Sequence, residues 1–238
     1  MQKTLWFFSD RFRLHGILHL PEVKNPPVVI GSHGLLSTGD SPKQIALAEA
    51  CVRQNMAYFR YDHRGCGQSE GDFAAATTFD GQCRDLVCAA RFLRDLPEIG
   101  KSFALFGSSF GGAVSLAMAK KIRPAAIVTL AAPLSSAGIK DPYVNDPANL
   151  PLVESLNRNA LLFDIRNQIS RISRLLIFHG DADPIVPFEN ALELHEKAAP
   201  PKRLVRQMNG DHPMSNPAHQ AEFMELTVAW FETYFQDV

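Results

Sequence analysis

Short apolar runs alternate with amphipathic segments along most of the chain. The apolar runs are typical of buried strands, and they occur at residues 28–30, 57–61, 102–106, 126–132, 175–179 and 204–207. Apolar residues at helical spacing predict helices over residues 41–54, 78–96, 110–121, 188–198 and 217–235. Strands that alternate with helices are typical of a mostly parallel sheet covered by helices on both faces. We therefore predict one α/β domain over residues 1–238.

Two stretches depart from this alternation. Residues 4–8 and 12–20 predict two strands joined by a tight turn at Ser9-Asp10, and because no helix separates them we expect an antiparallel edge. The second departure is a connection of 39 residues, 134–172, where a crossover needs only about a dozen. One interpretation is a crossover helix with an irregular loop. The other is a small lid, at about 134–172, over a site at the carboxyl edge of the sheet.

Composition excludes several classes of function. The chain has 24 Lys and Arg against 25 Asp and Glu, so no basic surplus is available to bind nucleic acid. No apolar run approaches the ~18 residues of a membrane span, and Ser9 and Asp10 interrupt any signal-like N-terminus. The four cysteines form no CxxC pair, and no acid completes a site around His15 and His19. We therefore predict a soluble, cytoplasmic protein with no metal and no cofactor.

The most informative segment is Gly107-Ser108-Ser109-Phe110-Gly111, which matches the motif G-x-S-x-G. It follows a predicted strand and opens a predicted helix, which is the context that the motif requires. Such a tight turn holds the nucleophile in strained backbone and accommodates only glycine at its flanks. A phosphate-binding loop or a plain small-residue turn would be the alternative. The spacing does not match G-x-G-x-x-G, and no P-loop lysine follows. Ser109 is therefore the candidate nucleophile.

Two later loops contain candidate partners for Ser109. The strand at 175–179 leads into a loop with Asp181 and Asp183, and we prefer Asp183 because it lies further from the strand. An Asp-rich turn without catalytic role is the alternative there. His212 lies in a turn directly after the last predicted strand. The order Ser109, Asp183, His212, each after a predicted strand, is that of the α/β-hydrolase triad.

These motifs make the chain resemble the α/β-hydrolase superfamily of serine hydrolases over nearly its whole length. Ser32-His33-Gly34-Leu35-Leu36 resembles the family's His-Gly loop after the third strand. Asp62 to Ser69 resembles its D-x-R-G-x-G-x-S turn after the fourth strand, and residues 179–187 resemble its acid loop. The strand-end position of His33 favours a role in bracing its loop over a role as catalytic base.

The resemblance implies a role for each site residue. Ser109 would attack the acyl carbon, with His212 as general base and then general acid. Asp183 would orient His212 and stabilise its cation. The backbone N–H groups of Leu35 and Phe110 would form the oxyanion hole.

Within the superfamily the chain is similar to small bacterial carboxylesterases, the cinnamoyl and feruloyl esterases, and to serine-aminopeptidase-like hydrolases. Serine at position 109 differs from the aspartate of haloalkane dehalogenases and epoxide hydrolases and from the cysteine of dienelactone hydrolases. The similarity implies hydrolysis of a small-molecule carboxylic ester through an acyl-enzyme. Peptide or amide cleavage and a non-catalytic binding module on the same fold are the alternatives. A homodimer is compatible with the sequence, which leaves the oligomeric state open.

Overall fold

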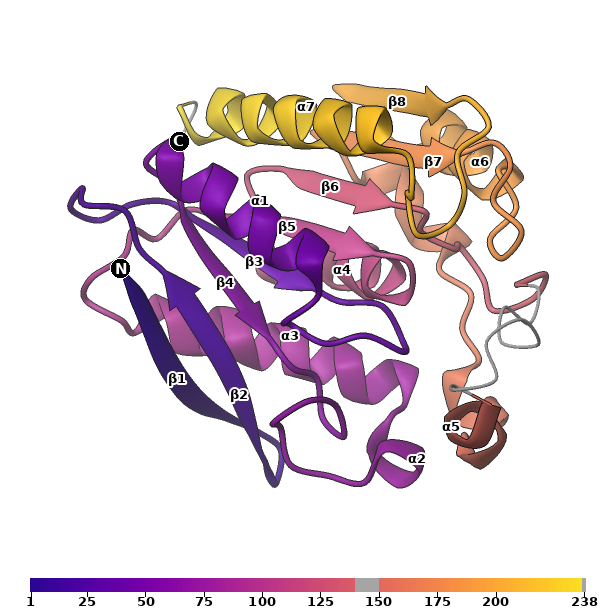
Figure 1. The fold of residues 1–238 in the computed structure, drawn as a ribbon, viewed down its shortest axis with the longest axis horizontal. Helices are drawn as coiled ribbons and strands as arrows, with labels where there is room; N and C mark the ends of the chain where they lie inside the picture. The colour runs from indigo at the N-terminus through magenta and orange to yellow at the C-terminus, as the bar shows by residue number, and fades with distance from the viewer. Residues whose placement is uncertain (140–149, 237–238) are drawn as a thin grey trace.

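The computed structural model describes residues 1–139 and 150–236 (Figure 1). Within this part of the chain, eight strands form one sheet in the order β1-β2-β4-β3-β5-β6-β7-β8. Strand β2 runs antiparallel to both of its neighbours, and every other neighbouring pair is parallel. The strands are β1 (Gln2–Ser9), β2 (Phe12–His19), β3 (Val28–Ser32), β4 (Ala57–Tyr61), β5 (Phe103–Ser108), β6 (Ile127–Leu130), β7 (Leu175–Gly180) and β8 (Lys202–Gln207).

Helices cover both faces of this sheet (Figure 1). Helices α1 and α7 pack on one face, whereas α3, α4 and α6 pack on the other. The prediction of a mostly parallel sheet between two helical layers, with an antiparallel edge, is confirmed. The helices are α1 (Pro42–Arg53), α2 (Phe73–Ala76), α3 (Phe79–Arg94), α4 (Phe110–Ile122), α5 (Leu150–Ser155), α6 (Glu189–Lys197) and α7 (Pro217–Phe235), with 3₁₀ helices η2 (Arg158–Leu161) and η3 (Arg166–Arg171).

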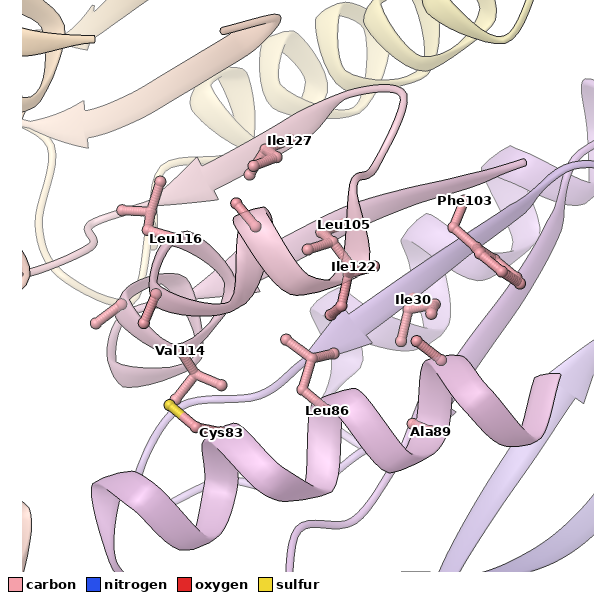
Figure 2. Packing of buried hydrophobic residues seen from close by; sticks show 14 of the residues in the cluster. Ile30, Cys83, Leu86, Ala89, Phe103, Leu105, Val114, Leu116, Ile122 and Ile127 are labelled. Carbon is pink, nitrogen blue, oxygen red and sulfur yellow. The ribbon is translucent and has the colours of Figure 1, made fainter. Parts of the chain in front are cut away.

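The strands separate two apolar cores because successive side chains point to opposite faces. Ile30 of β3 belongs to the core under α3 and α4, and its neighbour Val29 belongs to the core under α1 and α7. Figure 2 shows Ile30 and Leu105 of the sheet beside Leu86 of α3 and Ile122 of α4. Each such side chain contributes about 1.5–3 kcal/mol when it is fully buried. The two cores together fix the sheet from which the loops of the site project.

Two local predictions differ from the structure. The hairpin turn between β1 and β2 is at Asp10-Arg11, one residue later than predicted, because Ser9 still pairs with Phe12. Asp10 takes a φ of 52°, a conformation that aspartate tolerates in turns. The short helix α2 is not predicted by the apolar pattern. The connection over 134–172, for which the sequence offers a crossover helix with a loop or a lid, contains α5, η2 and η3.

The connection from 134 to 172 begins and ends on the core. Ser135 and Asp164 form an isolated antiparallel bridge, and Phe163 stacks on Phe79 of α3 at 4.3 Å between ring centroids. Residues 140–149 of the predicted lid lie outside the described residues. The role of this segment as a lid therefore stays a prediction.

None of the helices in residues 1–139 and 150–236 is long and apolar enough to cross a bilayer. The predicted cytoplasmic location stays a prediction.

Candidate active site

Ser109 occupies the sharp turn between the end of β5 and the start of α4. Its backbone has φ 53° and ψ −120°, a strained combination that costs about 1–3 kcal/mol for a residue with a side chain. Its N–H donates to the carbonyl of Leu130 at 2.8 Å, which ties the turn to β6. A Cβ at Gly107 would overlap the carbonyl oxygen of Gly111, and a Cβ at Gly111 would overlap that of Ser32. The two glycines of the motif therefore permit the close packing that presents Ser109.

The structure brings Ser109, His212 and Asp183 into one hydrogen-bonded chain. His212 Nε2 lies 3.0 Å from Ser109 Oγ, and His212 Nδ1 lies 2.7 Å from Asp183 Oδ2. An ionised carboxylate only accepts hydrogen bonds, so Nδ1 carries the proton of the imidazole. Nε2 is then the acceptor for the hydroxyl of Ser109.

Asp183 is held in place on both of its oxygens. Its side chain is fully buried, and Oδ1 accepts the backbone N–H groups of Ile185 at 2.8 Å and Val186 at 2.9 Å. Burial alone would raise the pKa of Asp183, but hydrogen bonds from His179 and His212 outweigh it and hold the pKa well below its usual range. Asp183 therefore stays an anion and a fixed acceptor for His212.

The other acid of the same loop has a different role. Asp181 accepts from Arg206 at 2.8 Å and from the backbone N–H of Asn209, on the outside of the turn. A Cβ at Gly180 would overlap the carbonyl oxygen of Gly210, so the two loops approach backbone to backbone. This packing brings the loop that carries Asp183 against the turn that carries His212.

The backbone groups predicted to form the oxyanion hole lie on either side of Ser109. Phe110 is the first residue of α4, where the N–H has no partner within the helix. A Cβ at Gly34 would lie 3.5 Å from the Cβ of Ser109, which shows how closely the loop after β3 approaches. Within residues 1–139 and 150–236, the N–H groups of Leu35 and Phe110 donate to no backbone or side-chain acceptor. Both are therefore free to bind an oxyanion.

His33 braces the loop that carries Leu35. Its Nε2 accepts the backbone N–H of His63 at 3.1 Å, so its proton is on Nδ1, which donates to the carbonyl of Gly34 at 2.7 Å. Burial lowers the pKa of His33 to about 3, which keeps the ring neutral. These contacts are those of a structural group and not of a general base.

A second Ser-His-Asp arrangement lies wholly inside the protein beneath this loop. His63 is 2.9 Å from Ser32 Oγ and 3.3 Å from Asp85 Oδ2, and all three side chains are buried. Asp85 also accepts from the guanidinium of Arg64 at 2.7 and 2.9 Å. Because these groups are buried and paired with one another, we interpret them as a brace for the ends of β3 and β4.

Asp85 is the residue of this brace that sequence reasoning missed. A signal was present, because Asp85 is four residues from Ala89 and so lies on the apolar face of the predicted helix 78–96. An acid on such a face needs a buried partner. His63 and Arg64, in the turn after β4, are the buried partners of Asp85.

A cavity of about 740 Å³ opens at Ser109 and His212. The loop after β3, the first turns of α1 and the beginning of α7 form its walls. Such a volume is in the range of small-molecule sites. No group of three or more His, Cys, Asp or Glu within the described ranges is arranged to hold a metal ion.

Sequence comparisons match the chain to known hydrolase families. The sequence model of the serine aminopeptidase (S33) family matches residues 24–158, and that of the prolyl oligopeptidase family matches residues 144–238. The uncharacterized protein YfhR of Escherichia coli O157:H7 is 29% identical over an alignment of 192 residues that covers 77% of this chain. The match spans 62% of the length of that relative.

Solved structures resemble this chain over almost its whole length. The esterase domain of a Rhodothermus marinus protein is 28% identical, with a TM-score of 0.70 over 97% of both chains. Est1E from Butyrivibrio proteoclasticus, solved with ferulic acid bound, has a TM-score of 0.75 at 19% identity over 98% of both chains. At that identity the likeness shows the fold alone, and the fold is that of the α/β-hydrolases.

Proposed function

Because the chain belongs to the serine aminopeptidase (S33) family of α/β-hydrolases, we propose that it cleaves a small carboxylic ester through an acyl-enzyme on Ser109. One observation carries the proposal. Ser109, His212 and Asp183 form a hydrogen-bonded chain with links of 3.0 and 2.7 Å, and the serine end opens into a cavity of about 740 Å³. Nucleophile, base and orienting acid are the three parts that acyl transfer to serine requires.

Acylation begins when Oγ of Ser109 attacks the ester carbonyl carbon. The hydroxyl proton moves to His212 Nε2, and the carbonyl oxygen becomes an oxyanion that accepts from the N–H groups of Leu35 and Phe110. Each such donor is worth about 10²–10³ in turnover. The imidazolium is stabilised by the ionised Asp183. When the intermediate collapses, the bond to the alcohol oxygen breaks, and His212 gives its proton to that oxygen.

Deacylation repeats these steps with water as the nucleophile. His212 Nε2 takes a proton from water while the water oxygen attacks the acyl carbon of the ester on Ser109. The same N–H groups hold the second oxyanion. Collapse releases the carboxylic acid, and the proton on His212 returns to Ser109 Oγ, which restores the starting state.

Cleavage of an amide or peptide bond is the second candidate, and the descriptions of both matching families favour it. The same triad serves either reaction, with an amine in place of the alcohol as leaving group. We place the ester first because a 28% identical solved structure is an esterase domain. A non-catalytic binding module on this fold is the remaining alternative, and it requires that Ser109 form no covalent adduct.

A direct test compares hydrolysis of p-nitrophenyl acetate by the wild-type protein and by Ser109→Ala. We expect the variant to lose at least about 10³-fold in kcat/KM, since removing a catalytic serine costs up to about 10⁶. Ser102→Ala is a matched control, because Ser102 lies just before β5, at the end opposite Ser109. Equal rates for wild type and Ser109→Ala would refute the proposal. A parallel assay with alanine p-nitroanilide decides between ester and amide.

A further inference from the structure

The cavity extends well beyond the triad. From Ser109 and His212 it continues to the first turn of α1 on one side and to Met214 and Met224, before and within α7, on the other. The proposed chemistry uses only the end with the triad. The remaining space has room for another part of the substrate.

This extension contains one lysine side chain. Apart from the two histidines of the site, Lys43 is the one basic or acidic side chain that lines the described cavity. Lys43 forms no ion pair and donates no hydrogen bond to any residue in the ranges 1–139 and 150–236. It is partly buried at the second residue of α1. An ammonium group in such a place lacks both full hydration and a counter-ion.

The charges around Lys43 do not supply that counter-ion. Burial lowers the pKa of Lys43 to about 8, and the charge of the Asp211 carboxylate, which forms no ion pair with Lys43, offsets part of this effect. The carboxylate of Asp211 accepts the backbone N–H of Ser215 at 2.7 Å. The other titratable groups of the cavity are His33, which is neutral, and His212.

The next residue along α1 is a glutamine whose amide nitrogen is buried and unpaired among the described residues. Gln44 lines the same cavity, and its side chain is 2% exposed. Its Oε1 accepts from the hydroxyl of Tyr58, while its Nε2 has no partner among the described residues. The first turn of α1 contains no acidic residue. No acidic residue of the described ranges therefore lines the wall at which Lys43 lies.

We propose that Lys43 pairs with a carboxylate on the substrate, so that the preferred esters are negatively charged. This deepens the proposed function and rests on it. An anionic ester would place its reactive carbonyl at Ser109 and its carboxylate at the start of α1. A neutral ester of the same size leaves the ammonium unpaired, and it is selected against for that reason.

The experiment uses two matched pairs of esters. In the first pair, monomethyl succinate and dimethyl succinate, the charge lies on the acyl part. In the second, 4-acetoxybenzoate and its methyl ester, the charge lies on the alcohol part. The readout is the ratio of kcat/KM for the anionic ester to kcat/KM for the neutral ester. We expect a ratio above one for the pair whose geometry fits.

Lys43→Met should lower that ratio about 10- to 100-fold, the value of one hydrogen bond to a charged group. Lys43→Arg keeps the charge and should retain most of the preference. Lys120→Met, at an exposed position of α4, is the matched control and should leave the ratio unchanged. With wild type the ratio should fall as the pH rises through about 8, where Lys43 loses its proton, and with Lys43→Arg this fall should move to higher pH.

An unchanged ratio in Lys43→Met for both pairs would overturn the proposed pairing of Lys43 with a substrate carboxylate. Hydrolysis of the neutral esters through Ser109 would not be affected by that result. A wild-type ratio at or below one for both pairs would also overturn the pairing. If the wild-type protein hydrolysed p-nitrophenyl acetate but none of the four esters, this inference would fail and the proposed function would stand; if it hydrolysed none of the five, both would fail.

Discussion

Replacing Asp183 by asparagine tests the proton arrangement of the site. Oδ1 of Asp183 accepts two backbone N–H groups, from Ile185 and Val186, and only an oxygen can do so. In Asp183→Asn the amide oxygen must therefore keep that place. The amide nitrogen then takes the place of Oδ2, which lies 2.7 Å from His212 Nδ1.

An N–H at that place reverses the tautomer of His212. Nδ1 becomes the acceptor, the ring proton moves to Nε2, and Nε2 can no longer accept the proton of Ser109. Loss of the correct tautomer in a serine triad costs about 10⁴ in turnover, or about 5 kcal/mol of transition-state stabilisation. We expect a loss of that size in kcat for p-nitrophenyl acetate, with KM changed much less.

The assay pairs steady-state kinetics with urea unfolding, which shows that the variant is folded. Asp181→Asn is the matched control, because the carboxylate of Asp181 faces Arg206 and not His212, and we expect its kcat to stay within a few-fold of wild type. A folded Asp183→Asn protein that lost less than tenfold in kcat would show that Asp183 does not set the tautomer of His212.

Further predictions concern the buried pair of Asp85 with Arg64 and the close packing at Gly111. Asp85→Asn breaks the buried pair with Arg64 and should cost about 3–5 kcal/mol in urea unfolding, a result that coincident unfolding curves would contradict. The pKa of Asp85 is about 2 in the folded protein, below its unfolded value of 3.8, so the ionised carboxylate stabilises the fold above pH 4. Between pH 4 and pH 2 the wild-type protein should lose about 2 kcal/mol in its free energy of unfolding through this group. Urea unfolding of Asp85→Asn over the same pH range should lack this part of the loss. Gly111→Ala places a Cβ against the carbonyl of Ser32 and should displace the oxyanion loop, so kcat should fall by about tenfold or more. An unchanged kcat in that variant would contradict the oxyanion assignment.

The pattern of apolar and polar residues predicted most of the fold, because buried strands and amphipathic helices repeat their apolar residues at different spacings. Alternating apolar runs and amphipathic segments placed the parallel strands and the longer helices, and α7 has the bounds that the pattern predicts. Strand ends were less predictable, since they depend on neighbours in the sheet. Strand β3 extends to Ser32, for example, because Ser32 pairs with Gly107 of β5.

The three site residues could be named from sequence because each follows a strand whose carboxyl end lies at the same edge of the sheet. Lys43 and Asp85 could not be assigned a place in the same way. Asp85 contacts His63, which lies 22 residues away in the sequence. The residues next to Asp85 in the sequence do not identify His63 as its partner. Lys43 has the appearance of an ordinary surface lysine in the first turn of α1, and only the folded chain places it in the cavity. Both depend on contacts between distant parts of the chain.

Covalent labelling tests whether Ser109 is the nucleophile. A fluorophosphonate reacts with a serine that an adjacent base has activated, and the adduct can be located by mass spectrometry of proteolytic peptides. We expect one adduct, on Ser109, which is absent in Ser109→Ala and much slower to form in Asp183→Asn. No adduct, or an adduct on another residue with Ser109 unmodified, would contradict that assignment.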